Sequence, residues 1–157
     1  MTLRLPALDP STLTPRTTST YPEVFQERVL PREKRPLGLA LGLTQFGVNL
    51  TTLSPGKASS LRHYHSHEEE FVYVLEGEVV LRTDEGEQTL TAGTCAGFRA
   101  GTTNGHQLVN RGAVPAKYLE VGSRHADDRA KYPEDDLSCE KNEEGSWVFS
   151  HRDGTPW

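Results

Sequence analysis

The sequence predicts an all-β protein, folded as an antiparallel sandwich or a small barrel. Apolar and polar residues alternate with a period of two through the middle of the chain, in short runs that end at glycine-bearing turns. This region contains no convincing segment with the 3.6-residue period of a helix. Its connections are also too short to hold crossover helices, which excludes a parallel α/β fold.

Residues 1–36 are expected to form an N-terminal arm and lead-in segment. Three prolines and a run of threonine and serine leave residues 1–20 with little apolar periodicity. Such a composition is typical of an extended arm that is ordered only where it lies on another part of the protein. Apolar residues around Phe25 and Val29 allow a short helical turn before the arm ends.

Residues 37–122 are expected to form the barrel core. Alternation of apolar residues with glycine, asparagine and threonine predicts strand structure across residues 37–53, ended by a turn at residues 54–57. A second strand is predicted at residues 61–65.

Two apolar runs, residues 71–75 and 79–83, are predicted to form a hairpin across Gly77. Turns are expected at residues 84–87 and 92–93. Further strands are predicted at residues 88–91, 95–98, 106–110 and 116–121.

Residues 123–157 are expected to form a C-terminal extension that packs back onto the barrel. The segment is polar and acidic, yet it ends with the apolar run 147–149 and with Trp157. A purely disordered tail rarely carries such residues.

The composition of the chain excludes several classes of function. A length of 157 residues is sufficient for one domain with its own core. A net charge of -5, with well-mixed charges, argues against a nucleic-acid or anionic-membrane surface. The chain has no apolar run of about 18 residues and no signal-peptide pattern, so we expect a cytoplasmic protein. Cys95 and Cys139 form no CxxC motif, and we expect two unpaired thiols, with Cys95 buried.

Residues 61–77 concentrate the candidate chemistry. His63, His65 and His67 occupy alternating positions, and on a strand residues two apart point to the same face, so a pair of them can bind one metal ion. Glu70 follows just before an apolar run and can add an oxygen ligand to the nitrogen ligands.

The spacing of these residues resembles the first sequence motif of the cupin superfamily. His63 and His65 form the histidine pair, Glu70 follows after four residues, and Gly77 follows after six more. The match also includes the preceding Gly56. Residues 61–77 therefore correspond closely to the part of that family that carries metal ligands.

A second cupin motif, a histidine with an asparagine four positions later, is similar to His106 and Asn110 after Gly93. The chain departs from this motif at residues 99–101, which read Arg-Ala-Gly where a proline is usual. The gap from Gly101 to the histidine is also longer than in the family. Both departures alter the loop ahead of the candidate ligand.

The resemblance implies a cupin double-stranded β-helix, a jelly-roll barrel, that holds one divalent ion through His63, His65, Glu70 and His106. Three nitrogen ligands and one oxygen ligand suit Zn, Mn, Fe, Ni or Co, and they leave two positions open in a six-coordinate ion. His67 shares a face with His65, but the spacing from this pair to Glu70 is shorter than in the family. We therefore assign His67 to the rim of the site.

Two further residues beside the second motif, Arg99 and Gln107, are candidate anion or hydrogen-bond partners for a substrate. Surface roles are the alternative interpretation of both. The outward side chains of Phe71, Tyr73 and Leu75 form an apolar stripe that the arm, the Trp147 segment or a second subunit must cover. We expect a homodimer in which the arm crosses over.

The resemblance to small single-domain bacterial cupins, some described as sugar-phosphate-isomerase-like, implies a metal-dependent enzyme acting on a small polar molecule of the carboxylate or sugar type. Isomerase, lyase and dioxygenase chemistry remain open, because the fold hosts all of them. The first alternative is a non-catalytic binding or sensor module that holds a small molecule through the same metal. The second is a purely structural metal.

Overall fold

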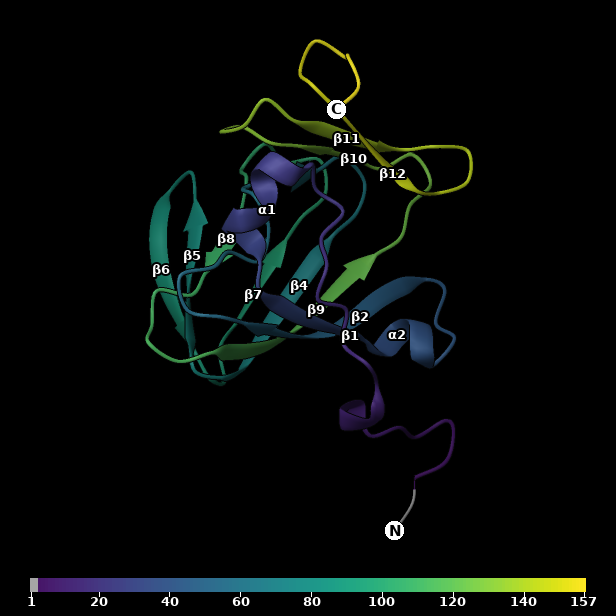
Figure 1. Cartoon of the computed structure of the whole chain (residues 1–157), viewed down its shortest axis with the longest axis vertical. Helices are drawn as coiled ribbons and strands as arrows, with labels where there is room; N and C mark the ends of the chain where they lie inside the picture. Colours follow the sequence, from purple (N-terminus) through teal and green to yellow (C-terminus); the bar gives the residue numbers. More distant parts are fainter. Residues whose placement is uncertain (1–2) are drawn as a thin grey trace.

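The computed structural model of the chain describes residues 3–157. Twelve β-strands, two short α-helices and one 3-10 helix form this part of the chain (Figure 1). The prediction of an all-β protein is confirmed, because the strands assemble into three antiparallel sheets. No helix within residues 3–157 is long and apolar enough to cross a membrane.

The largest sheet has five strands in the order β1-β2-β9-β4-β7. Its strands are β1 (Arg32–Pro36), β2 (Phe46–Leu53), β9 (Ala116–Ser123), β4 (Glu70–Glu76) and β7 (Cys95–Phe98). The apolar positions of these strands alternate as the period of two requires, so that one face of the sheet is buried and the other is partly exposed.

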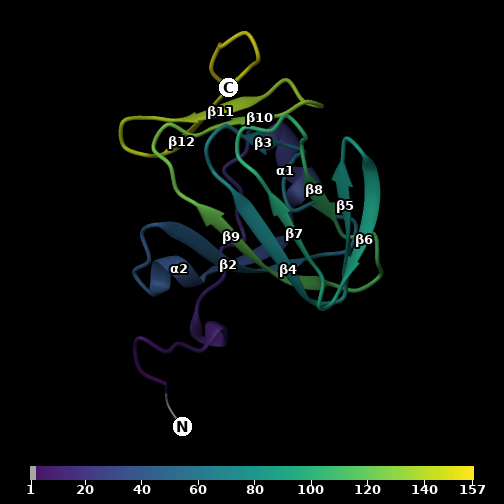
Figure 2. The same cartoon turned by 180° about the vertical axis from the view of Figure 1, so that it is seen from behind.

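The smallest sheet, with the strand order β6-β5-β8, packs against the buried face of the five-stranded sheet. Its strands are β5 (Glu78–Thr83), β6 (Gly86–Thr91) and β8 (Gln107–Val109). Figure 2 shows β5 and β6 standing opposite β4 and β7. The barrel core lies between the two sheets and consists of Leu53, Val72, Val74, Val79, Leu81, Leu90, Leu108, Ala116 and Tyr118.

A four-stranded sheet, in the order β12-β11-β10-β3, carries the C-terminal extension across one end of the barrel (Figure 1). Its strands are β3 (Tyr64–His65), β10 (Arg129–Lys131), β11 (Ser138–Lys141) and β12 (Trp147–Ser150). Ala130 pairs with His65, so the extension is joined directly to the histidine-bearing segment. A second apolar cluster fixes this end, and it consists of Leu61, Ala130, Tyr132, Leu137 and Cys139.

The N-terminal segment contributes to the same end of the barrel. Helix α1 (Glu23–Val29) forms where a helical turn was expected, and its Phe25 packs against the second apolar cluster together with Tyr21. A short 3-10 helix, η1 (Pro10–Thr12), precedes it in the arm. Arg16 then pairs with Lys34 of β1, which places this part of the arm beside the five-stranded sheet.

The strand predicted over residues 37–43 is wrong, since Leu37–Ala40 form the helical turn α2. The alternation of leucines in this stretch does not correspond to a buried face, since Leu39 is 71% exposed. Gly38 lets the turn lie against β2, because an added Cβ would be 2.8 Å from the backbone nitrogen of Val48. Within residues 37–53, strand structure begins only at Phe46.

The hairpin predicted across Gly77 is also wrong. Strand β4 pairs with β7 and β9, whereas β5 pairs with β6 and β8, so the chain passes from one sheet to the other at Gly77. Only one residue separates the two strands, and the tightest common hairpins need two. The predicted turn after β5 is confirmed, because Thr83 pairs with Gly86.

We expect Gly77→Ala to destabilise the protein more than Gly42→Ala. Both glycines have a φ of 72°, which costs an alanine about 1 kcal/mol. At Gly77 an added Cβ would also lie 3.2 Å from Ala116 Cα and from Pro115 O, whereas nothing lies within 4 Å at Gly42. Urea unfolding should show a loss of about 1 kcal/mol for Gly42→Ala and about 2–4 kcal/mol for Gly77→Ala. Equal losses would contradict the close approach at the sheet crossing.

Candidate metal centre

His63 and His106 are placed side by side by an isolated antiparallel bridge between two otherwise irregular segments. The backbone N–H of His63 donates to the carbonyl of His106 at 3.1 Å, and the reverse hydrogen bond is 2.8 Å long. Residues paired in this way project to the same side, and the two ring centroids are 4.6 Å apart. Histidines that are far apart in the sequence therefore share one site.

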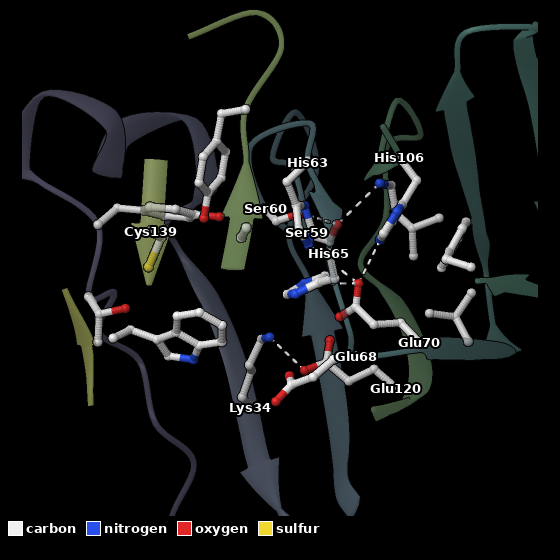
Figure 3. A pocket seen from close by; sticks show the side chains of 18 of the residues that line it. Lys34, Ser59, Ser60, His63, His65, Glu68, Glu70, His106, Glu120 and Cys139 are labelled. Carbon is white, nitrogen blue, oxygen red and sulfur yellow. Dashed lines mark hydrogen bonds and ion pairs between the residues drawn. The ribbon is translucent and has the colours of Figure 1, made fainter. Parts of the chain in front are cut away.

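Glu70, the first residue of β4, is the point at which the histidines converge (Figure 3). Its Oε2 lies 2.7 Å from Nε2 of His106, 3.3 Å from Nε2 of His63 and 3.6 Å from Nε2 of His65. The structure thus places all four residues that the sequence motifs single out around one carboxylate, with ligand atoms of His63, Glu70 and His106 all within 4.8 Å of one another and His65 at the side of the group, next to Glu68 and Asp128. We refer to His63, His65, Glu70 and His106 as the metal-site residues.

The Nδ1 atoms of His63 and His65 both donate hydrogen bonds to other groups of the protein. Nδ1 of His63 donates to the carbonyl of Leu61 at 2.9 Å, and Nδ1 of His65 donates to a carboxylate oxygen of Asp128 at 2.6 Å. In a neutral ring this leaves a lone pair on Nε2, and here both lone pairs face Glu70. Lone pairs that face a carboxylate repel it. A cation bound between the two Nε2 atoms and the Glu70 carboxylate would be attracted to all three groups, so the donor set fits a divalent metal ion.

The electrostatic environment favours the protonation states of metal ligands at Glu70 and His106. Burial alone would raise the pKa of Glu70, but the hydrogen bond from His106 and the close approach of the His63 ring hold it well below its usual value. Burial lowers the pKa of His106 despite its hydrogen bond to Glu70. The His106 ring also stacks on Phe98, with centroids 3.6 Å apart and planes 4° from parallel. A neutral imidazole and an ionised carboxylate are the forms that bind a metal.

Asp128 completes the site, and sequence reasoning missed it. Its side chain is fully buried, and besides His65 it accepts hydrogen bonds from the backbone N–H groups of His67 and Glu68, at 2.8 and 3.0 Å. Burial acts to raise the pKa of Asp128, but these hydrogen bonds lower it. Burial acts to lower the pKa of His65, but the hydrogen bond to Asp128 and the negative charges of Glu70 and Asp128 have the larger effect and raise it.

The sequence contains little that could have identified Asp128. It stands in an acidic stretch that is typical of a solvated surface, and it lies 63 positions from its histidine partner. Only the pairing of β10 with β3 brings the two side chains together. A carboxylate in this position fixes both the tautomer and the orientation of a metal-binding histidine.

The remaining sequence-predicted site residues lie outside this cluster. His67 is exposed, and its ring stacks on that of His125 with centroids 4.6 Å apart. Gln107 is buried, and its amide is used by the protein, because it donates to Ser60 O and accepts from Arg82, both at 2.7 Å. Arg99 is exposed beside a recess of about 10 Å³ that it shares with Glu70 and His106.

The metal-site residues form part of the wall of a cavity of about 340 Å³. The arm contributes Arg16 and Tyr21, and β1 contributes Arg32 and Lys34. The extension contributes Ala130, Tyr132, Cys139, Trp147 and Phe149. A volume of this size is sufficient for a small molecule, and the cavity exists only because both ends of the chain lie against the barrel.

Both cysteines are free, but the prediction that Cys95 is buried is wrong. Strand β7 is an edge of the five-stranded sheet, and Cys95 pairs with Tyr73, whose side chain points outward. Alternation along the strand therefore places Cys95 on the exposed face. Cys139 is the buried thiol, and it lines the cavity.

One thiol per chain is expected to react with Ellman's reagent at about pH 8. Burial, reinforced by the charges of Asp128 and Glu140, raises the pKa of Cys139 to about 12, so only a minute fraction of this thiol is the reactive thiolate. Cys95 should react at once, and Cys95→Ser should leave no thiol reactive until the protein is unfolded. Rapid reaction of two thiols in the folded protein would contradict the burial of Cys139.

The chain is similar to a known family and to several solved structures. The cupin domain family model matches residues 49–122. The crystal structure of a sugar phosphate isomerase from a cupin superfamily, from Silicibacter pomeroyi, is 44% identical, covers 97% of this chain and 96% of that chain, and has a TM-score of 0.91. A candidate sugar phosphate isomerase from Acidithiobacillus ferrooxidans is 30% identical, with 80% of each chain covered and a TM-score of 0.71.

A polyketide cyclase from Streptomyces resistomycificus shares the fold at 21% identity, with 78% of this chain and 80% of that chain covered and a TM-score of 0.62. No curated protein matches the chain. The identity to the Silicibacter pomeroyi protein extends over almost the whole of both chains, and it confirms the resemblance that the two motifs indicate and the jelly-roll barrel that it implies. The chain belongs to the cupin superfamily.

Proposed function

We propose that the protein is a metal-dependent enzyme that acts on a small, oxygen-rich molecule of the carboxylate or sugar type. One observation carries this proposal: three imidazole Nε2 atoms surround a single carboxylate oxygen, within 3.6 Å of it, on the wall of the cavity. A site of this kind is open on one side, whereas a purely structural metal site is usually closed by protein ligands.

The metal-site residues would hold the ion, with three nitrogen ligands and one oxygen ligand. A divalent ion bound there would polarise a carbonyl or hydroxyl oxygen of the substrate as a Lewis acid. Asp128 would keep the His65 ring in place through the 2.6 Å hydrogen bond at Nδ1. Tyr132, Trp147 and Phe149 would exclude bulk water from the cavity.

The two similar structures with isomerase names support sugar phosphates as the first substrates to test. Interconversion of an aldose and a ketose phosphate moves one proton between neighbouring carbons and one between their oxygens, so it needs no oxidant or reductant. Lewis-acid polarisation of the carbonyl oxygen is the contribution that a metal makes to such a reaction.

The full chain, purified without a polyhistidine tag, tests the proposal. Elemental analysis should find about one ion of Zn, Mn, Fe, Ni or Co per chain. Proton NMR of aldose and ketose phosphates should show interconversion that stops on chelation and returns with the metal. Failure to bind any of these metals would sink the proposal. Metal-dependent ligand binding without turnover would instead indicate a binding or sensor module, and chelation that lowers only the melting temperature would indicate a structural ion.

We also propose a homodimer in the cytoplasm. Phe71, Tyr73 and Leu75 are each 38–40% exposed on the outer face of the five-stranded sheet, and such a stripe favours a partner. The Trp147 segment does not cover it, because Trp147 lines the cavity, and Arg16 of the arm pairs within its own chain. Sedimentation that shows only monomer at micromolar concentration would contradict the dimer.

The proposed location in the cytoplasm is supported by the two free cysteines, because thiols stay reduced in that compartment.

A further inference from the structure

The charged side chains on the cavity wall are not all paired with one another. Lys34 and Glu120 neutralise each other through an ion pair of 2.5 Å (Figure 3). Glu68 is paired in the same way with Lys141, and Glu70 faces the histidines. Within residues 3–157, no carboxylate lies within ion-pair distance of the two other cations on the wall, Arg16 and Arg32.

Arg32 is the more unusual of these two cations, because it is only 7% exposed. Its Nη1 donates to the carbonyl of Ser59, while its Nε is buried without a hydrogen-bond partner. Arg35, on the same strand, also has an unpaired Nε, but its charge is matched by Glu33 at 3.1 Å. Burying a charge without a partner costs several kcal/mol, and a bound anion would remove that cost.

The free edge of the guanidinium has the right form for an oxyanion. With Nη1 engaged by Ser59, Nε and Nη2 remain, and these two N–H groups lie on one edge that can donate two parallel hydrogen bonds to a phosphate or a carboxylate. Nη2 of Arg32 makes no hydrogen bond with another described residue. Lysine would offer no such edge, so the residue type itself favours a planar or tetrahedral oxyanion.

A second buried donor faces the same cavity. Tyr118, which β9 places on the wall, is fully buried, and its hydroxyl makes no hydrogen bond of normal geometry with a described residue; its polar neighbour is the hydroxyl of Thr51, which is buried and unpaired as well. Burial raises the pKa of Tyr118 well above its usual value, even though the nearby charge of Arg32 acts in the opposite direction. The hydroxyl therefore stays protonated, and it can donate to an acceptor bound in the cavity while Thr51 is its polar neighbour within the protein.

The chain also links Arg32 to the metal-site residues. The carbonyl of Ser59 accepts from Arg32, and the hydroxyl of the next residue, Ser60, lies 3.2 Å from Nδ1 of His63. The unpaired guanidinium and the candidate metal ligand are thus held by two consecutive residues. A small molecule in the cavity can reach both.

We propose that Arg32, with Arg16 at the more exposed side of the cavity, forms a subsite that binds the phosphate or carboxylate group of the molecule whose other end reaches the metal-site residues. The identity of that molecule rests on the proposed function, whereas the anion subsite itself rests on the two arginines. The wall carries three arginine or lysine side chains and three glutamates, so a divalent ion on Glu70 would make it net positive and favour an anionic ligand.

The test is calorimetric titration of the full chain with inorganic phosphate, and separately with acetate, before and after removal of metal by chelation. At least one of the anions should bind saturably, and Arg32→Met should weaken that binding at least tenfold. The matched control is Arg35→Met, on the same strand but outside the cavity wall, which should bind as the wild type does. Arg16→Ala should weaken binding by a smaller factor, roughly threefold.

Arg32→Met carries a second readout that a structural role would not produce. Replacing a buried, unpaired charge with an apolar side chain of similar length should leave the melting temperature unchanged or raised. If this variant fails to fold, the exposed residue Arg16 still provides the test. Absence of anion binding, or binding that none of these arginine changes weakens, would overturn the subsite. Binding that depends on Arg32 in a protein that takes up no metal would retain the subsite and overturn only the proposed function.

Discussion

His106→Ala is expected to lower the metal content of the purified protein from about one ion per chain to less than about a tenth of that value. His106 is the metal-site residue supplied from outside residues 61–77, and its Nε2 is the nitrogen closest to Glu70, at 2.7 Å. Without it, two imidazoles and one carboxylate remain, and one side of the site opens to the barrel interior. Elemental analysis after dialysis measures the change, and any metal-dependent turnover should be lost with the ion.

The control for this experiment is His67→Ala. Its imidazole is exposed and stacks on His125 away from the cluster, so its removal should leave the metal content unchanged. The pair of variants therefore tests which alternating histidines are ligands. Full metal content in His106→Ala, or loss of metal in His67→Ala, would show that the ligand set is wrong.

Asp128→Asn is expected to weaken metal binding by about 10–100-fold, although Asp128 is not one of the metal-site residues. The carboxylate accepts hydrogen bonds from His65 Nδ1 and from two backbone N–H groups. An asparagine of the same shape must turn its NH2 group toward one of these donors, which leaves a buried donor unpaired. We expect the free energy of unfolding to fall by about 2–4 kcal/mol and the melting temperature to fall by about 4–16 °C.

Asp127→Asn is the matched control, because that side chain is 84% exposed and next in sequence. It removes the same charge from the same segment, so it should change neither metal affinity nor unfolding. Competition with a fluorescent zinc chelator measures affinity, and thermal denaturation measures stability. Wild-type metal affinity in Asp128→Asn would refute the role of this carboxylate in holding His65.

Much of the candidate site could be predicted because its residues obey local rules. Strand alternation places His63 and His65 within reach of one ion, and the family spacing selects this pair over the one that includes His67. The second motif then supplies His106. Asp128 could not be predicted in the same way, since its role depends on a contact across 63 positions.

The fold was predictable to a similar extent. The strands between residues 95 and 123 begin and end close to their predicted positions, because short apolar runs between glycine turns leave few alternatives. The three strands of the C-terminal extension, β10, β11 and β12, were not predicted. The passage of the chain from one sheet to the other at Gly77 could not be predicted, since strands that follow each other in the sequence more often pair with each other than belong to different sheets. The exposed residues Leu39, Leu41 and Leu43, in and just after α2, show why the strand prediction failed there: an alternating pattern predicts a strand only where one face is buried.

The sequence by itself determined the class of fold, the types of ligand atom and the three histidines and one glutamate that converge. These properties depend on residue identity and on spacing over a few residues. Only the tertiary structure decided which strands pair, which carboxylate holds His65 and which arginine is buried without a counter-charge. The reason is physical: backbone N–H and C=O groups are the same in every strand, so partners are chosen by the burial of side chains over the whole chain.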